Sequence, residues 1–273
     1  MKTCLTIAGS DSSGGAGIQA DLKTFAALNV YGMSAITALT AQNTLGVHGV
    51  SSVDPNFIAL QIRSVFDDIY PDAIKIGMLA NTGIINSAAE TLQSYNATNI
   101  VLDPVMIATS GDPLLDNESV RNLIDRLIPL ADIITPNISE LLALCVAQGL
   151  NINHSDTITS TDLKTLTDSL FKSLPVKKDG SRVAILSKGG HLENDDAIDY
   201  LYDGQNEQWL RHKRIETHNT HGTGCTLSSA ICAQLAKGNP IDEACVNAKN
   251  YLTNALAKKL DLGSGNGPLD HTL

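Results

Sequence analysis

Short apolar segments alternate with longer amphipathic segments along most of this chain. The short segments are rich in isoleucine, valine and leucine and lack strict polar alternation, which is typical of parallel strands buried on both faces. They lie at residues 4–8, 34–39, 73–77, 100–102, 132–135 and 183–187. In the longer segments apolar residues recur every three or four positions, which predicts helices. These helices lie at residues 18–28, 55–69, 82–94, 118–130, 138–148 and 160–174.

The regular order of strand and helix predicts an α/β fold with three αβα layers and a mostly parallel, doubly wound sheet. The pattern changes at residues 197–202 and 208–215, which are joined by the turn Asp203-Gly204-Gln205-Asn206. Because Asp-Gly favours a hairpin turn, we expect an antiparallel edge there. Helices at 222–237 and 240–259 follow. No segment has the composition of a linker between domains, so we expect residues 1–273 to form one domain.

The composition argues against several classes of protein. The net charge is −10, whereas a nucleic-acid binder normally carries a basic surface. Five cysteines without Cys-x-x-Cys spacing argue against a zinc site or a disulfide framework and favour the reducing cytoplasm. The first apolar run is too short for a signal peptide, and no stretch approaches the about 18 consecutive apolar residues of a membrane span. We therefore expect no nucleic acid and no membrane as partners.

The most informative segment is a glycine-rich helix entrance, Asn219-Thr220-His221-Gly222-Thr223-Gly224-Cys225-Thr226. Glycines at the start of a helix leave backbone N–H groups open, and the helix dipole behind them favours an anion such as phosphate. Cys225 lies in the first turn, where the same field favours a thiolate that takes a proton. The alternative is that the glycines only shape a turn and that Cys225 is a small packed residue.

A second glycine-rich loop follows the first predicted strand, and its residues 15–20 match the dinucleotide pattern Gly-x-Gly-x-x-Ala. An NAD site needs an acidic residue roughly 20 positions further on to hold the ribose, and none occurs between Lys23 and Val53. The sequence therefore disfavours NAD and favours close approach of a small polar molecule. Asp21 either accepts a hydrogen bond from an amino group of that molecule or is a surface acid favoured by the helix dipole.

Polar side chains follow three further predicted strands. Asp103 follows one strand, and Asn137 and Glu140 lie on one face of the helix that follows another. Together they are suited to hold Mg²⁺ through water, although Asn137 and Glu140 also fit a helix capping box. Lys188, after a further strand, either neutralises phosphate charge or is an exposed lysine without a role.

Two familiar catalytic motifs are missing from the sequence. It has neither a Walker loop for ATP nor a Gly-x-Ser-x-Gly nucleophile elbow. His221 stands four residues before Cys225, which raises a cysteine–histidine nucleophilic enzyme as an alternative. No third residue that would orient the histidine is evident in the sequence.

Taken together, these motifs resemble the hydroxymethylpyrimidine/phosphomethylpyrimidine kinases of thiamine synthesis, within the ribokinase-like superfamily. The resemblance spans nearly the whole chain and depends on an ordered set of motifs. The set comprises residues 8–24, 40–44, 75–79, 102–106, 110–112, 135–137, 188–191, 219–226 and 267–269.

The resemblance implies ATP- and Mg²⁺-dependent phosphorylation of 4-amino-5-hydroxymethyl-2-methylpyrimidine, and then of its monophosphate. It implies that Cys225 is the base, where most of the superfamily has aspartate, and that the amides around Gly222 and Gly224 hold the transferred phosphoryl group. The implied pyrimidine contacts are Ala16, Asp21, Gln42, Met78 and Val105. The implied nucleotide contacts are Asn137, Lys188, Thr220 and Thr223, with the metal at Asp103 and Glu140.

The sequence leaves neighbouring functions open. A pyridoxal or pyridoxine kinase would use the same fold on a similar flat ring with a hydroxymethyl group. A pyrimidine-binding sensor without catalysis belongs to a different class, and retention of Cys225 and both glycine loops argues against it. The resemblance also suggests a homodimer, whereas the need for a monovalent cation stays open.

Overall fold

The computed structural model describes residues 1–106, 115–152, 157–190, 192 and 196–272. Two parts of the family motifs, residues 110–112 and His191, lie outside the described residues. In the part of the chain that is described, no helix is long and apolar enough to cross a membrane.

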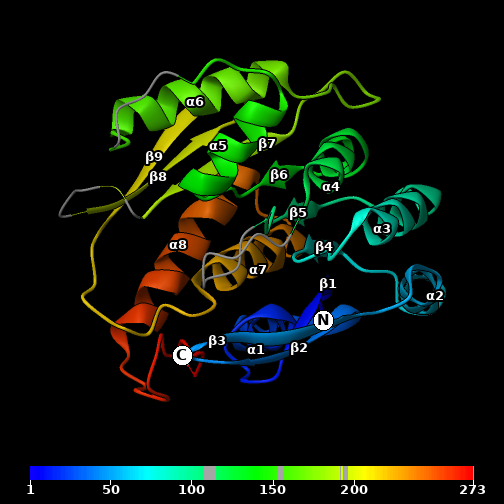
Figure 1. The fold of residues 1–273 in the computed structure, drawn as a ribbon, viewed down its shortest axis with the longest axis horizontal. Helices are drawn as coiled ribbons and strands as arrows, with labels where there is room; N and C mark the ends of the chain where they lie inside the picture. The colour runs from blue at the N-terminus through cyan, green and yellow to red at the C-terminus, as the bar shows by residue number, and fades with distance from the viewer. Residues whose placement is uncertain (107–114, 153–156, 191, 193–195, 273) are drawn as a thin grey trace.

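One mixed sheet forms the centre of the fold (Figure 1), and its nine strands in the described residues run in the order β3-β2-β1-β4-β5-β6-β7-β8-β9. The strands from β2 through β7 pair in parallel, while β3, β8 and β9 add antiparallel pairs at the two edges. The strands are β1 (Thr3–Asp11), β2 (Tyr31–Asn43), β3 (Gly46–Ser52), β4 (Ala73–Ile76), β5 (Ile100–Leu102), β6 (Ile133–Ile134), β7 (Ala184–Gly189), β8 (Asp196–Tyr202) and β9 (Glu207–Lys213).

Helices cover both faces of the sheet, and each face has its own apolar core. One core holds Ile62, Ile84 and Leu163 and is covered by α2 (Pro55–Phe66), α3 (Thr82–Ser94), α4 (Asn117–Asn122), α5 (Ile138–Ala147) and α6 (Ser160–Ser173). The other holds Phe25 and Ile231 and is covered by α1 (Gly17–Ala27), α7 (Thr223–Ala236) and α8 (Ile241–Ala257). The predicted three-layer α/β fold is therefore confirmed, because a parallel sheet must be covered on both faces.

Two predictions about elements were wrong in detail. The sequence predicted one antiparallel edge, but β3 forms a second beside β2. The sequence carries no signal for β3, because most of its residues are exposed and it lacks an apolar pattern. The single helix expected at 118–130 is instead α4, a π-helical turn (Leu123–Leu127) and a 3₁₀ turn (Ile128–Leu130). Pro129 explains the change, because it lacks a backbone N–H and crowds the preceding turn.

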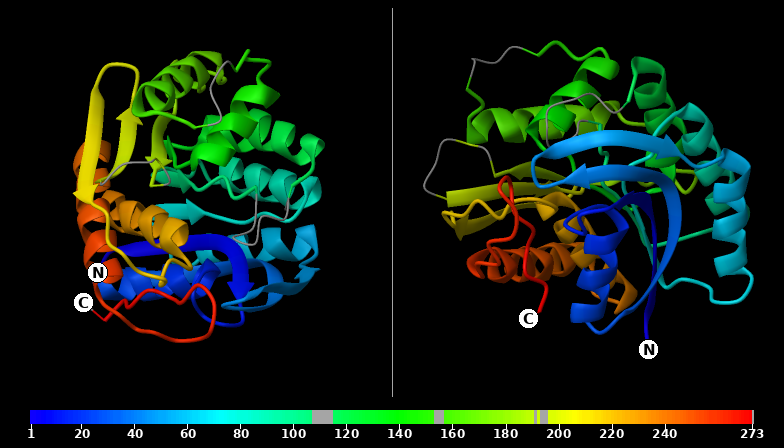
Figure 2. Two further views of the ribbon diagram at one scale, coloured as in Figure 1. Left: turned by 60° about the vertical axis from the view of Figure 1, so that its left-hand side comes forward. Right: turned by 60° about the horizontal axis from the view of Figure 1, so that its bottom comes forward.

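The carboxyl ends of the parallel strands meet at one edge, where a doubly wound sheet binds its ligands. β1 ends at Asp11, β5 is followed by Asp103, and Lys188 lies near the end of β7. The chain after α8 returns past the same edge, as Figure 2 shows in red. Its Asn266 donates a backbone hydrogen bond to Thr44. The sequence-distant glycine loops are thus gathered at one place.

Candidate active site

The entrance to α7 leaves three backbone N–H groups open. Gly222 is the N-cap residue, has a left-handed backbone with φ 85°, and supplies no side-chain cap. Within the described residues, the backbone N–H groups of Gly222, Gly224 and Cys225 have no hydrogen-bond partner. The N–H of Thr223 is occupied, because it donates to the Thr220 carbonyl at 3.3 Å. Open amides at the positive end of a fourteen-residue helix are suited to an anion.

The two glycine loops touch each other at backbone level. A Cβ atom added at Gly222 would lie 1.9 Å from the Gly15 carbonyl oxygen, and one added at Gly15 would lie 2.4 Å from the His221 ring. Both distances are far inside van der Waals contact. Only glycine therefore allows the loop after β1 and the entrance to α7 to meet.

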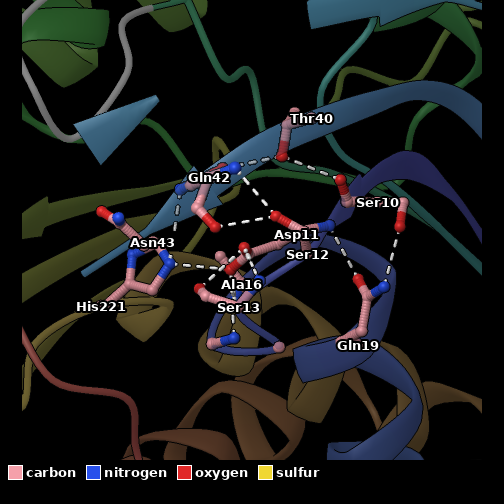
Figure 3. A network of polar contacts seen from close by, with 12 residues as sticks. Ser10, Asp11, Ser12, Ser13, Ala16, Gln19, Thr40, Gln42, Asn43 and His221 are labelled. Atoms are coloured by element: carbon pink, nitrogen blue, oxygen red, sulfur yellow. Dashed lines mark hydrogen bonds and ion pairs between the residues drawn. The ribbon is translucent and has the colours of Figure 1, made fainter. Parts of the chain in front are cut away.

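A buried aspartate and a histidine join these loops (Figure 3). Asp11 Oδ2 lies 2.8 Å from His221 Nε2 and also accepts the backbone N–H groups of Gly15 and Ala16. Burial raises the pKa of Asp11, but the bonds from His221, Ser13 and Ala16 outweigh it and hold that pKa well below its usual range. Asp11 is therefore an anion that fixes both loops.

The contacts of His221 do not fit the role of a base for Cys225 that the sequence raised as an alternative. Its Nε2 lies 3.4 Å from Gln42 Nε2 in addition to its contact with Asp11 (Figure 3). Within the described residues, no hydrogen bond joins the His221 ring to Cys225. A cysteine nucleophile would therefore lack its histidine base here. Sequence reasoning missed the partnership with Asp11, although an acid at the head of a glycine loop was a usable signal.

On the other side of the open amides, Lys188 stands between two carboxylates. Its Nζ lies 2.8 Å from Asp103 Oδ1 and 3.9 Å from Glu140 Oε2. Asn137 and Glu140 form the capping box of α5, with each side chain accepting the other residue's backbone N–H. Gly224 faces this pair, since a Cβ there would lie 3.3 Å from Lys188 Nζ. Of the two alternatives for Lys188, an exposed lysine without a role is therefore wrong, because Lys188 is a partly buried ion-pair partner.

The charges of this group are unevenly balanced. Burial alone would raise the pKa of Asp103, but Lys188 and Lys75 lower it below its usual value. Burial raises the pKa of Glu140 to about 7; Lys188 opposes this shift and Asp103 adds to it. Lys188 is thus the ion-pair partner of two carboxylates, Asp103 and Glu140, and neutralises them only in part. Two carboxylates with excess negative charge suit a hydrated Mg²⁺ ion, which keeps several waters and needs few carboxylates.

Cys225 does not carry the thiolate that its position in the helix predicted. Burial raises the pKa of Cys225 to about 11, because it outweighs the lowering by Lys75 and by the hydrogen bond from the Gly17 backbone N–H. Asp21 and Asp103 raise that pKa further. The thiol is therefore protonated at neutral pH in this structure, and burial together with two nearby carboxylates is the physical reason for the correction.

Asp21 is also not the group we expected from the sequence. The side chain is fully buried, and both carboxylate oxygens are occupied by Lys75, Thr6 and Ser229. A substrate amino group cannot reach it, and it is not a surface acid. The sequence signal for this was Lys75, a charged residue inside a buried strand, which needs a buried counter-ion.

The remaining predicted residues divide into two groups. Ala16, Gln42, Met78 and Val105 are all partly buried. Ala16 lies in the first glycine loop, Gln42 contacts that loop through Ser12, and Met78 lies against Gly9, where a Cβ would be 3.3 Å from its Sδ. Val105 follows β5, and all four stay candidates for the substrate side. Thr223 is part of the entrance to α7, whereas Thr220 is exposed.

Residues 11–270 match the phosphomethylpyrimidine kinase family. The chain belongs to this family. It is similar to a hydroxymethylpyrimidine/phosphomethylpyrimidine kinase of Escherichia coli, with 47% identity over 98% of this chain and 96% of that protein. The family that the motifs resembled is thus confirmed.

Solved structures agree on the fold. A phosphomethylpyrimidine kinase from Clostridium difficile superposes with a TM-score of 0.77 at 44% identity, covering 94% of this chain and all of that chain. A Bacillus subtilis pyridoxal kinase, solved as an ADP complex, superposes with a TM-score of 0.85 at 37% identity, covering 100% and 98%. The expected ribokinase-like fold class is confirmed, and a structural neighbour holds a nucleotide.

Proposed function

We propose that this chain is an ATP-dependent kinase that phosphorylates 4-amino-5-hydroxymethyl-2-methylpyrimidine and then its monophosphate, as a step of thiamine biosynthesis. One observation carries the proposal. Gly224 places the open amides of α7 directly against the Lys188–Asp103 ion pair, with Cys225 as the next residue. Anion-binding amides, an ammonium group and a thiol that becomes a proton acceptor once it is deprotonated therefore lie together, as phosphoryl transfer to a hydroxyl group requires.

The residues act mainly by position and charge. The amides of Gly224 and Cys225 hold the oxygens of the transferred phosphoryl group, and Lys188 neutralises part of their charge. For this step the Cys225 thiol first releases its own proton to solvent, and the resulting thiolate Sγ then accepts the proton of the substrate hydroxyl. Phosphoryl transfer has a loose transition state in most analyses, so the hydroxyl proton leaves late, and the thiolate of a weakly acidic thiol is a sufficient base. Asp11 and His221 keep the two glycine loops in register around the hydroxyl.

We propose Asp103 and Glu140 as the residues that hold Mg²⁺ through its waters, with Asn137 as the N-cap residue of α5 beside Glu140. When bound, the ion supplies charge neutralisation for the nucleotide phosphates. Lys188 is held in place by the same carboxylates. Adding Mg²⁺ at fixed ATP is expected to restore turnover to the protein after treatment with EDTA, and Asp103→Asn is expected to raise the concentration of Mg²⁺ required.

A pyridoxal kinase is the second candidate, because a pyridoxal kinase superposes over the whole of this chain. Higher identity to the pyrimidine kinases, 47% against 37%, favours the pyrimidine. Gln42 also favours it, since a carboxamide can both donate to and accept from an aminopyrimidine edge.

A side-by-side assay tests the proposal. Purified protein, ATP and Mg²⁺ are mixed with the hydroxymethylpyrimidine or with pyridoxal, and ADP and the phosphorylated ring are measured by chromatography. We expect kcat/KM to be at least tenfold higher for the pyrimidine and to see a diphosphate form on longer incubation. Equal or greater turnover of pyridoxal would favour the second candidate. Ring binding without ADP release would indicate a sensor.

We also propose a homodimer in the cytoplasm. Phe57 and Leu60 on α2 are about half exposed and supply apolar surface for a second copy. Light scattering is expected to give twice the mass of one chain, and Leu60→Asp is expected to shift the protein towards one chain. A single-chain mass for the unaltered protein would contradict the dimer.

A further inference from the structure

A fully buried ion pair lies beneath the candidate active site. Lys75 on β4 and Asp21 on α1 both have no exposed side-chain surface, and Lys75 Nζ lies 3.0 and 2.9 Å from the two carboxylate oxygens. The mechanism above uses neither residue. A buried pair of this kind is costly to desolvate and often contributes little to stability compared with apolar residues. Its presence directly under the site therefore calls for a functional explanation.

The pair is connected to the helix that carries Cys225. Ser229 on α7 donates a hydrogen bond of 2.6 Å to Asp21 Oδ1, and Thr6 on β1 donates one of 2.6 Å to Oδ2. Ser229 lies four residues after Cys225, so both side chains are on the same face of the helix. The face of α7 that presents the thiol therefore rests on the Lys75–Asp21 pair.

Charges from several elements act on the thiol. Lys75 on β4 and Lys188 on β7 carry positive charge, whereas Asp21 on α1 and Asp103 after β5 carry negative charge. Burial lowers the pKa of Lys75, but Asp21, Cys225 and Asp103 raise it well above its usual range, so the ammonium persists at every working pH. Such a charge in a dry interior acts strongly on its neighbours.

We propose that Lys75 is a positioning residue that sets the acidity of the Cys225 thiol, with Asp21 holding the ammonium in place and opposing its effect. The ammonium stabilises the thiolate, and the carboxylate destabilises it. Because the two charges are fixed side by side, their effects on the thiol partly cancel, so Cys225 is protonated at neutral pH yet can release its proton during catalysis. Only this catalytic consequence rests on the proposed function.

The pH dependence of alkylation tests the acidity directly. Cys225 is the partly exposed cysteine among the five, and the other four are buried, which makes it the expected site of reaction with iodoacetamide. The rate is followed by intact mass and the site by peptide mapping, in the full chain without substrate. The variants are Lys75→Met, Asp21→Asn, the double variant and, as a control, Ser229→Ala.

The proposal fixes the sign of each shift. Lys75→Met is expected to raise the pKa of the thiol by about one unit or more, and Asp21→Asn to lower it by a similar amount. The double variant is expected to return close to the original value. Ser229→Ala loosens the same packing without changing a charge, so the pKa of the Cys225 thiol should shift by less than about 0.3 units. Shifts of one sign in both single variants would indicate structural damage and overturn the proposal.

The effect of the Lys75 charge can be tested even if one single variant does not fold. If Lys75→Met alone does not fold, the double variant is compared with Asp21→Asn, because this step also removes the lysine charge and leaves no unpaired buried carboxylate. If the pKa of the Cys225 thiol does not rise from Asp21→Asn to the double variant, the proposal is overturned. The acidic limb of the pH profile of kcat is measured in the same variants. Alkylation shifts without parallel kcat shifts would leave the Lys75 assignment intact and reject Cys225 as the base.

Discussion

Asp11 and His221 are 210 positions apart in the sequence, yet Asp11 Oδ2 and His221 Nε2 lie 2.8 Å apart in the interior. This contact holds the loop after β1 against the entrance to α7. It also places Gln42, at the end of β2, beside the His221 ring. The acceptor side and the phosphoryl side of the candidate site are therefore aligned by one hydrogen bond between two segments that are far apart in the sequence.

Asp11→Asn is expected to lower kcat/KM by about thirtyfold or more, because a charged, buried hydrogen bond contributes roughly 2 kcal/mol. Steady-state assays with the pyrimidine measure the effect. Asp72→Asn is the matched control, since Asp72 accepts a backbone N–H from Thr3 at the opposite end of β1. Equal losses in both variants would show that a general loss of stability, rather than loop alignment, is responsible.

The backbone contact between the loops gives a second prediction. Gly222→Ala is expected to cost more than about 2 kcal/mol in the free energy of unfolding, because the new Cβ would meet the Gly15 carbonyl oxygen. Gly238 has a similar left-handed backbone, with φ 90° and open space around it, so Gly238→Ala should cost about 1 kcal/mol. Urea unfolding measures both, and equal values would refute the contact.

The thiol of Cys225 is expected to matter for chemistry rather than for folding. Cys225→Ala should lower kcat by about a hundredfold, the lower range for loss of a general base. Cys232→Ala, on the buried part of the same helix, should change kcat little and stability more. If Cys225→Ala keeps kcat within about threefold, under ~0.7 kcal/mol of barrier, the thiol is not the base.

Glu140 links stability to pH. Burial, with Asp103, raises its pKa from 4.5 to about 7, so the folded chain keeps a proton that the unfolded chain has already released. Stability from this group is therefore complete below about pH 4.5 and is lost as the pH rises through 7. The contribution of Glu140 to the slope of the unfolding free energy against pH is expected to disappear in Glu140→Gln, because glutamine still fits the capping box.

Unfolding free energies between pH 5 and 8 measure this difference. Above pH 7, Glu140→Gln is expected to be more stable than the unaltered chain by about 1–3 kcal/mol and less active with Mg²⁺. Glu118→Gln, an exposed change in the first turn of α4, is expected to leave the slope unaltered. An unchanged slope in Glu140→Gln would contradict the raised pKa.

Much of the fold could be predicted from the sequence because its signals are local. The buried strand at 100–102 and the helix at 82–94 were predicted with the bounds that the structure has. β3 carried no such signal, because a mostly exposed strand needs no apolar pattern. The glycine loops and the acids at strand ends were also visible, since turn residues and strand ends have fixed meanings in this fold class.

The electrostatics of the site could not be predicted in the same way. The position of Cys225 in a helix suggested a thiolate, but its pKa depends on burial and on Asp21 and Asp103, which are far away in sequence. The role of Asp21 depends on Lys75, 54 positions away. Such pairings arise only when tertiary packing brings strands and helices together, so local sequence rules cannot supply them.

A crystal structure of the protein with a non-hydrolysable ATP analogue, Mg²⁺ and the hydroxymethylpyrimidine tests the central claim most directly. We predict the terminal phosphate within about 3 Å of the backbone N–H groups of Gly224 and Cys225, with the substrate hydroxyl directed at Cys225 Sγ. A terminal phosphate bound elsewhere, with those two amides facing only water, would contradict the account.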